Sequence, residues 1–104
     1  MPDRVLPETR AAVFRRDGQC LLFVIDASHV CRDQWGEPHA PDDMGKLTIE
    51  HVRTDPGGMR RSDQWHLVAM CHHGNVNHAG STTEARALLN AYLAGARAER
   101  YGRP

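Results

Sequence analysis

The chain has no long apolar run, and this absence excludes several classes of protein. No stretch approaches the roughly 20 consecutive apolar residues that a membrane-spanning helix needs. The first residues, Met-Pro-Asp-Arg, contain no apolar signal core. We therefore expect an intracellular, cytoplasmic protein that has no membrane partner.

Aromatic residues are few, since the 104 residues include two Phe, two Trp and two Tyr. A chain of this length is near the lower limit for a self-sufficient core, so we expect residues 1–104 to form one domain. With so little aromatic surface to bury, the fold would benefit from a bound metal. Composition alone does not say which metal.

An excess of charge of either sign is also missing, because 13 Lys plus Arg balance 13 Asp plus Glu. The chain therefore generates no strong overall field that would attract nucleic acid. Lys46 is the only lysine, so the other twelve basic residues are Arg. Arginine favours bidentate phosphate contacts, but the codon usage of a GC-rich genome produces the same bias, and the two interpretations are equally good.

Cysteine and histidine are the residues that stand out. The three cysteines, Cys20, Cys31 and Cys71, cannot all pair in disulfides, and a reducing compartment keeps them as thiols. Seven His in the same chain favour the interpretation that these thiols bind a metal. The alternative is that they are buried as small hydrophobic groups.

The pattern of apolar residues predicts an α+β fold. Residues 7–17 begin with Pro and are followed by Gly18, which predicts a short helix. Alternation over residues 46–52 predicts a strand, and the apolar residues 66–71 predict a second strand antiparallel to it. The run 20–25 is either a buried strand or a loop held by the cysteines.

Turn-forming residues in the segment 53–64 predict a loop between the two strands. After the second strand, residues 72–78 predict a short helix. Ser81 and Glu84 match a capping box, so a C-terminal packing helix is expected over about residues 82–98. The apolar stripe of that helix consists of Leu88, Leu89, Tyr92, Leu93 and Ala96.

Polar residues with the character of a catalytic site lie at the ends of the predicted strands. Glu50 and His51 end the first strand, His66 opens the second fifteen residues after His51, and Asn75 follows nine residues later. This order, together with the intervening apolar pattern, resembles the HNH endonuclease family, the ββα-metal nucleases, over about residues 18–80. The alternative is that these histidines are exposed, or buried and hydrogen-bonded.

The resemblance implies a ββα-metal core with flanking N- and C-terminal helices, and an enzyme that hydrolyses DNA phosphodiester bonds. In that interpretation His51 is the general base that takes a proton from water. Glu50 and Asn75 would supply oxygen ligands for Mg²⁺ or Mn²⁺, which relieves charge on the departing 3′ oxygen.

Two further histidines have open roles. His66 occupies a position where the family usually has Asn, and it either orients the catalytic base or ligates the metal. His78 suits the variant of the family that uses a His ligand, although at a slightly shifted spacing. It is therefore the second candidate, after Asn75, for the ligand on the helix.

Many members of the family also hold a structural zinc ion with paired cysteines. The resemblance assigns Cys20, Cys31 and Cys71 to that site. The fourth position is Gly74, which cannot ligate, so His73 or His72 would have to substitute, and we expect His73. His29, two residues before Cys31, is a less favoured ligand.

Contacts with the phosphates of DNA are expected from Arg53, Arg60 and Arg61, in the loop beside the proposed catalytic residues. An ordinary solvated loop explains these arginines equally well. By analogy with the family, a compact chain of this kind fits a phage or prophage setting. The main alternative function is a non-catalytic zinc module that binds nucleic acid or protein.

Overall fold

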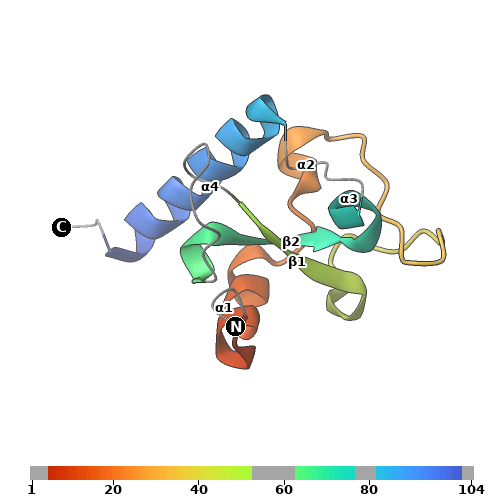
Figure 1. The fold of residues 1–104 in the computed structure, drawn as a ribbon, viewed down its shortest axis with the longest axis horizontal. Coiled ribbons are helices and arrows are strands. Elements are labelled where there is room, and N and C mark those ends of the chain that lie inside the picture. Colours follow the sequence, from red (N-terminus) through yellow and green to blue (C-terminus); the bar gives the residue numbers. More distant parts are fainter. Residues whose placement is uncertain (1–4, 53–62, 77–81, 102–104) are drawn as a thin grey trace.

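The structure, a computed structural model, describes residues 5–52, 63–76 and 82–101. Within these ranges helices and a small antiparallel sheet combine into one mixed fold (Figure 1). The helices are α1 (Pro7–Asp17), α2 (Leu22–Ile25), α3 (His72–Val76) and α4 (Thr83–Tyr101), and the strands are β1 (Leu47–His51) and β2 (Leu67–Cys71). Two short 3₁₀ turns, η1 (Met44–Lys46) and η2 (Gln64–His66), lead into the strands.

The two strands form the antiparallel pair that the sequence predicts. Leu47 lies opposite Cys71 at one end of the pair and His51 lies opposite Leu67 at the other. One further bond, from the Val52 N–H to the His66 carbonyl (2.8 Å), extends the pairing beyond His51. The sheet therefore has two distinct ends, and each end carries a different group of polar or sulfur-containing side chains.

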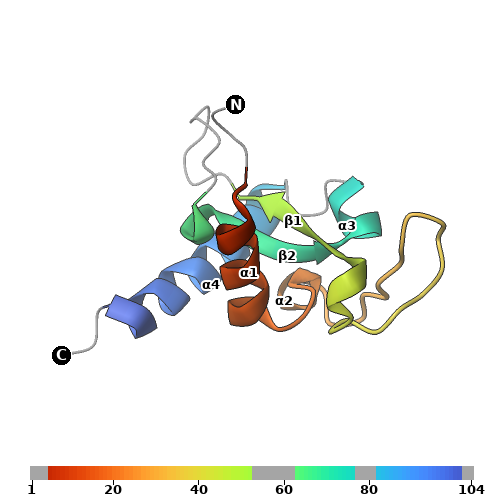
Figure 2. The ribbon, with the colours of Figure 1, turned by 90° about the horizontal axis from the view of Figure 1, so that it is seen from below.

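Strand β2 is the centre of the core. All five of its residues are buried, whereas β1 is buried at Leu47 and half-buried beyond it. Figures 1 and 2 show why: α1 and α4 lie on either side of the start of β2, and α3 lies beyond its end. The helices around this apolar strand shield its whole length from water. Such burial of apolar surface is the main source of stability in a small domain.

Helix α1 has the limits that its sequence predicts. It begins at Pro7 and ends at Gly18, where the backbone adopts φ 69° and the Gly18 N–H donates to the Phe14 carbonyl (2.9 Å). A left-handed residue at this position favours glycine because a Cβ would clash with the backbone. The prediction of a helix over residues 7–17 is confirmed.

Within segment 20–25 the short helix α2 covers Leu22–Ile25, so neither a strand nor a loop held by the cysteines describes that part of the segment. The Leu21 N–H donates to the Ala69 carbonyl (2.9 Å) of β2. The chain then turns into the helix, which buries Leu22. An apolar run of this length has no periodicity that separates a strand from a buried turn of helix.

Helix α4 packs through a narrower stripe than expected. Ala85, Leu89 and Leu93, four residues apart, are buried, but Leu88 is 38% exposed. At its start the Thr82 hydroxyl accepts from the Ala85 N–H (3.1 Å), while Ser81 of the predicted capping box lies outside the described residues. No helix in the described part of the chain is long and apolar enough to cross a membrane.

A buried carboxylate joins α1, β2 and α4. The side chain of Asp17 is fully buried and accepts from the Ala69 N–H (2.7 Å) and from the Tyr92 hydroxyl (2.6 Å). Arg16 pairs with the same carboxylate (2.6 Å) and also donates to the Leu67 carbonyl (2.6 Å). Because the Asp17 carboxylate pairs with Arg16 and accepts two further hydrogen bonds, the network links α1, β2 and α4 without leaving a buried charge unpaired.

Candidate functional site

A cluster of three cysteines and one histidine lies at the Leu47–Cys71 end of the sheet. Their ligand atoms all lie within 4.8 Å of one another, and the members are Cys20, His29, Cys31 and Cys71. Cys20 precedes α2, His29 and Cys31 lie in the segment that follows α2, and Cys71 is the last residue of β2. This cluster could hold a metal ion such as zinc.

The spacing within the cluster suits a tetrahedral site. With Zn–S bonds of about 2.3 Å, neighbouring sulfurs in a tetrahedron are separated by roughly 3.8 Å. His29 Nε2 lies 3.2 Å from Cys71 Sγ, and the three thiols are free cysteines whose residues are at most 2% exposed. A cation at the centre would therefore be shielded from water on the cysteine side.

The electrostatics of the cluster also favour a cation. Burial raises the pKa of the Cys20 thiol, and burial together with the neighbouring Cys20 thiol raises the pKa of Cys31. Burial lowers the pKa of His29, which keeps its imidazole neutral and able to ligate. Three thiols this close can ionise together only if a positive ion neutralises them, and a bound zinc ion does so.

Backbone N–H groups support the sulfur atoms. The Cys71 N–H donates to Cys20 Sγ (3.2 Å), and the Gly74 N–H donates to Cys71 Sγ (3.4 Å). Such bonds stabilise negative charge on sulfur and orient the side chain that carries it. They tie the start of α2 and the start of α3 to the same cluster.

A turn after α2 brings His29 into position. The Asp26 carboxylate accepts from the backbone N–H (3.0 Å) and the hydroxyl (2.6 Å) of Ser28, and the His29 N–H donates to the Asp26 carbonyl (3.1 Å). The His29 ring then packs edge-on against Phe23, with ring centroids 5.5 Å apart. Two independent contacts therefore fix the orientation of this imidazole.

The fourth member of the cluster is thus His29, and His73, the ligand that the sequence favoured, lies outside the group. His73 is exposed, and its N–H donates to the Arg32 carbonyl (3.2 Å). A Cβ at Gly74 would lie 2.0 Å from Leu22 Cδ1, so this position has no room for a ligating side chain. The signal in the sequence was the spacing of His29 and Cys31, with a single residue between them.

The opposite end of the sheet carries the residues predicted to be catalytic. His51 lies opposite Leu67 and Glu50 lies opposite Val68, and the Val52–His66 bond brings His66 to the same end. Glu50, His51 and His66 are all half-buried. The three residues come from two different elements, and the pairing of the strands places them at the same end of the sheet.

His66 has a carboxylate partner that the sequence analysis did not single out. Its Nδ1 lies 2.8 Å from Asp63, which precedes η2 and also accepts from the Trp65 N–H (2.9 Å). A carboxylate on one ring nitrogen fixes the orientation of the imidazole and leaves the other nitrogen for a second contact. The Asp63–His66 spacing of three residues was the available signal.

Asn75 ties α3 to β1 through its side-chain amide. The amide nitrogen donates to the Thr48 hydroxyl (2.9 Å) and to the Ile49 carbonyl (3.1 Å). The Thr48 hydroxyl in turn donates to the Met70 carbonyl (2.8 Å). Both amide hydrogens are therefore used, and the amide oxygen is the atom of Asn75 suited to ligation.

Four of the predicted site residues, namely His78, Arg53, Arg60 and Arg61, lie outside the described residues. Comparison with protein-family models, with curated proteins and with solved structures found no match. The case for a function therefore rests on the two groups of side chains at the ends of the sheet.

Proposed function

We propose that this protein is a metal-dependent endonuclease that hydrolyses DNA phosphodiester bonds. The observation that carries the proposal is that Glu50, His51 and His66 lie at one end of the sheet, while Asn75 of α3 is hydrogen-bonded to β1. A general base, a carboxylate and an amide oxygen are the groups that metal-assisted hydrolysis of a phosphodiester requires.

In this mechanism His51 acts as the general base. A neutral imidazole accepts a proton from water as the water oxygen forms a bond to phosphorus, and the bond to the 3′ oxygen breaks. His51 lies at the end of β1 and is half-buried, which limits the solvent around it. His66, oriented by Asp63 through Nδ1, would accept a hydrogen bond from a water molecule at its second ring nitrogen.

Glu50 and Asn75 would hold the catalytic ion. Their carboxylate and amide oxygens are hard ligands that suit Mg²⁺ or Mn²⁺, and the amide nitrogen of Asn75 is already engaged with β1. A divalent ion at this position would supply stabilisation of the negative charge on the departing oxygen. His78, as an additional ligand, and Arg53, Arg60 and Arg61, as phosphate contacts, belong to the same proposal.

The cysteine and histidine cluster is proposed to hold structural zinc. A site with four protein ligands is closed to substrate, which is typical of structural rather than catalytic zinc. The burial of the three cysteines and the fixed orientation of His29 support this assignment. Zinc there would stabilise the fold on which the opposite end of the sheet depends.

A second candidate function is a non-catalytic zinc module that binds nucleic acid or protein. The observation in its favour is that the cluster is complete without any residue from the proposed catalytic group. In such a module the half-buried His51 would have no catalytic role.

Nicking of supercoiled plasmid DNA separates the two functions. We expect nicking with Mg²⁺ or Mn²⁺, and a loss of about 100-fold or more in His51→Ala, because a general base contributes on that order. His73→Ala, the same change at an exposed position outside both groups, serves as the control and should nick normally. Full activity in His51→Ala would exclude His51 as the base, and a folded, zinc-loaded wild type that never nicks would favour the module.

A further inference from the structure

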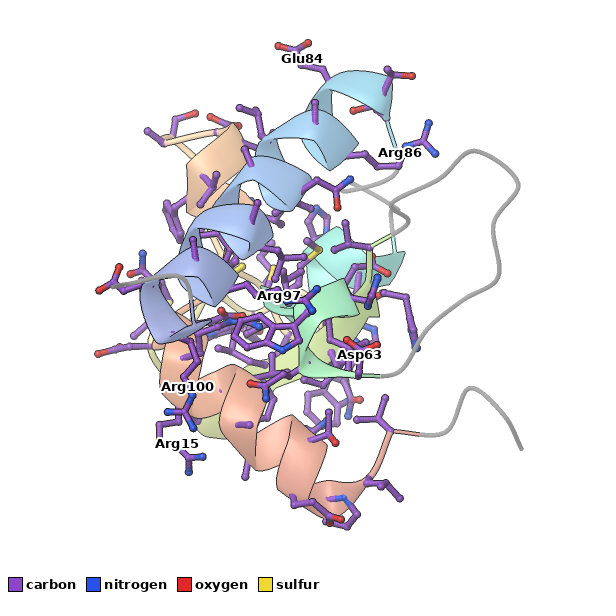
Figure 3. All side chains as sticks on the ribbon, turned by 90° about the vertical axis from the view of Figure 1, so that its left-hand side faces the viewer. Arg15, Asp63, Glu84, Arg86, Arg97 and Arg100 are labelled. Carbon is purple, nitrogen blue, oxygen red and sulfur yellow. The ribbon has the colours of Figure 1, made fainter. Side chains whose placement is uncertain are left out.

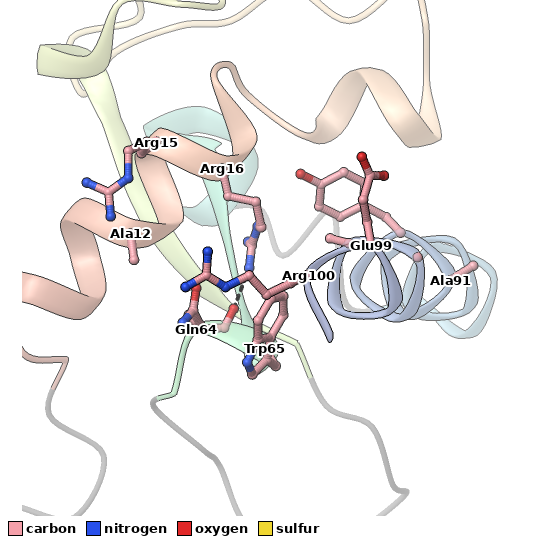
Figure 4. Close-up of a pocket in the computed structure, with 11 residues that line it drawn as sticks. Ala12, Arg15, Arg16, Gln64, Trp65, Ala91, Glu99 and Arg100 are labelled. Atoms are coloured by element: carbon pink, nitrogen blue, oxygen red, sulfur yellow. Dashed lines mark hydrogen bonds between the residues drawn. The ribbon is translucent and has the colours of Figure 1, made fainter. Parts of the chain in front are cut away.

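A groove with no role in the proposed chemistry lies between α1, η2 and α4. It encloses about 710 Å³, which is in the range of pockets that bind small ligands. Arg15 and Arg16 of α1, Trp65 of η2, and Tyr92, Glu99 and Arg100 of α4 line it. In Figure 4 α1 and α4 lie on opposite sides of the groove, with Trp65 on the η2 side.

Arg16 belongs to the framework of the groove rather than to its binding surface. Its guanidinium donates to the carbonyls of Gln64 (2.5 Å) and Leu67 (2.6 Å), and its charge is balanced by the buried Asp17. The same guanidinium lies over the Trp65 ring, 5.9 Å from the ring centroid. Arg16 therefore holds the indole of Trp65 in a defined orientation at the wall of the groove.

The rim of the groove is basic. Arg15, in the last turn of α1, and Arg100, in the last turn of α4, are exposed, and Glu99 is the single acidic residue in the lining. Ala12, Ala91 and Gly95 in the walls leave the space between these side chains open. An aromatic ring beside two arginines provides a stacking surface for a base and positive charge for a phosphate.

We propose that this groove binds one nucleotide of the DNA strand that extends from the cleavage site. The base would lie against Trp65, and the phosphate would lie against Arg15 and Arg100. The proposal rests on the proposed function, because Trp65 and His66 are neighbours in η2 and a strand that contacts one passes close to the other. The groove thus accounts for how a protein of zero net charge holds a polyanion.

Tryptophan fluorescence tests the proposal without requiring cleavage. The chain has two tryptophans, so Trp35→Phe leaves Trp65 as the only one. Trp35 is 73% exposed and does not line the groove, so we expect this change to leave the groove intact. In a Trp35→Phe, His51→Ala protein without added Mg²⁺, a thymidine octanucleotide should quench Trp65. Stacking on one aromatic residue changes affinity by about 5- to 150-fold. Trp65→Ala should therefore weaken the binding of a dye-labelled octanucleotide by a factor in that range, and fluorescence anisotropy measures this affinity.

Matched arginine variants test the basic rim. Arg15→Gln combined with Arg100→Gln should weaken binding and reduce the salt dependence by about one unit of slope for each lost phosphate contact. Arg86→Gln is the control, because Arg86 and Arg100 lie at opposite ends of α4 (Figure 3). Equal weakening by the control, absence of quenching, or equal quenching by a hexaglutamate peptide would each overturn the proposal.

The outcome is separable from that of the nuclease proposal. Quenching by the octanucleotide with no plasmid nicking would support the groove and remove the nuclease. Nicking with no quenching, and with full activity in the Arg15→Gln, Arg100→Gln protein, would support the nuclease and remove the groove.

Discussion

The two ends of the sheet differ in burial and in the chemistry of their side chains. At the Leu47–Cys71 end, three buried cysteines and His29 form a closed cluster. At the His51–Leu67 end, Glu50, His51 and His66 are half-buried, and in the described part of the chain no four-ligand cluster of that kind encloses them. A closed set of ligands suits stability, and an open set suits binding or reaction.

The comparison bears on how so small a chain can keep acidic and basic residues half-buried. Half-buried acidic and basic side chains give up some solvation, and a domain of this size has little core with which to offset that loss. A metal bound at the opposite end adds stability without enlarging the core. Strand β2 joins the two ends, since it runs from Leu67 beside His51 to Cys71 in the cluster.

The largest effect is expected from removing a ligand at the closed end. Cys71→Ser should abolish zinc binding, and since structural zinc contributes about 10 kcal/mol or more to folding, the variant should be unfolded. Circular dichroism and elemental analysis measure both results. His51→Ala, at the open end of the same sheet, should keep its zinc and its melting temperature. A folded Cys71→Ser protein with wild-type zinc content would break the comparison.

A smaller effect is expected from the choice of the histidine ligand. His29→Ala should weaken zinc affinity by at least about 100-fold, because even residues that only support a ligand are worth 10- to 100-fold. His73→Ala should leave the affinity unchanged, since His73 lies outside the cluster. Competition with a chromogenic chelator gives both constants. The reverse order of effects would place His73, and not His29, at the metal.

The smallest effect is expected at Tyr92 in the buried carboxylate network, because Tyr92 belongs to neither group of side chains at the ends of the sheet. Burial and the hydrogen bond to Asp17 raise the pKa of Tyr92 to about 12. Because the folded state holds the Tyr92 proton more tightly than the unfolded state, this contribution to stability is complete below about pH 10 and is lost between about pH 10 and 12. Tyr92→Phe should cost about 1 kcal/mol at neutral pH, and that difference should shrink across this interval.

Urea unfolding of both proteins between pH 7 and 12 tests the expectation. The thiols are common to both chains, so their titration cancels in the difference. Zinc content and plasmid nicking should be the same in both proteins. A difference in unfolding free energy that stays constant up to pH 12 would contradict the role of Tyr92.

Local patterns predicted much of the fold. Pro7 and Gly18 mark the limits of α1, and the alternation that ends at His51 marks β1, because turn chemistry and strand periodicity depend on neighbouring residues. Segment 20–25 was misassigned because four residues of helix in a buried environment leave no periodic signature. Leu88 was misassigned because a sequence pattern does not set the width of a buried stripe.

The candidate site was predicted in part for a similar reason. The sequence grouped Cys20, Cys31 and Cys71 correctly, and the structure brings all three together. Which histidine joins them depended on the fold, which brings His29 to Cys71 and leaves no room for a side chain at position 74 beside Leu22. Such contacts join residues about 50 positions apart, and no local pattern records them.

The positions of the cluster residues along the chain have a consequence for the order of folding. Cys20, His29 and Cys31 lie within twelve residues of one another, whereas Cys71 lies forty residues further on. Closing a short loop is faster and loses less entropy than closing a long one. Zinc would therefore be captured first by the three early ligands, and the arrival of Cys71 would then draw β2 into its place beside β1.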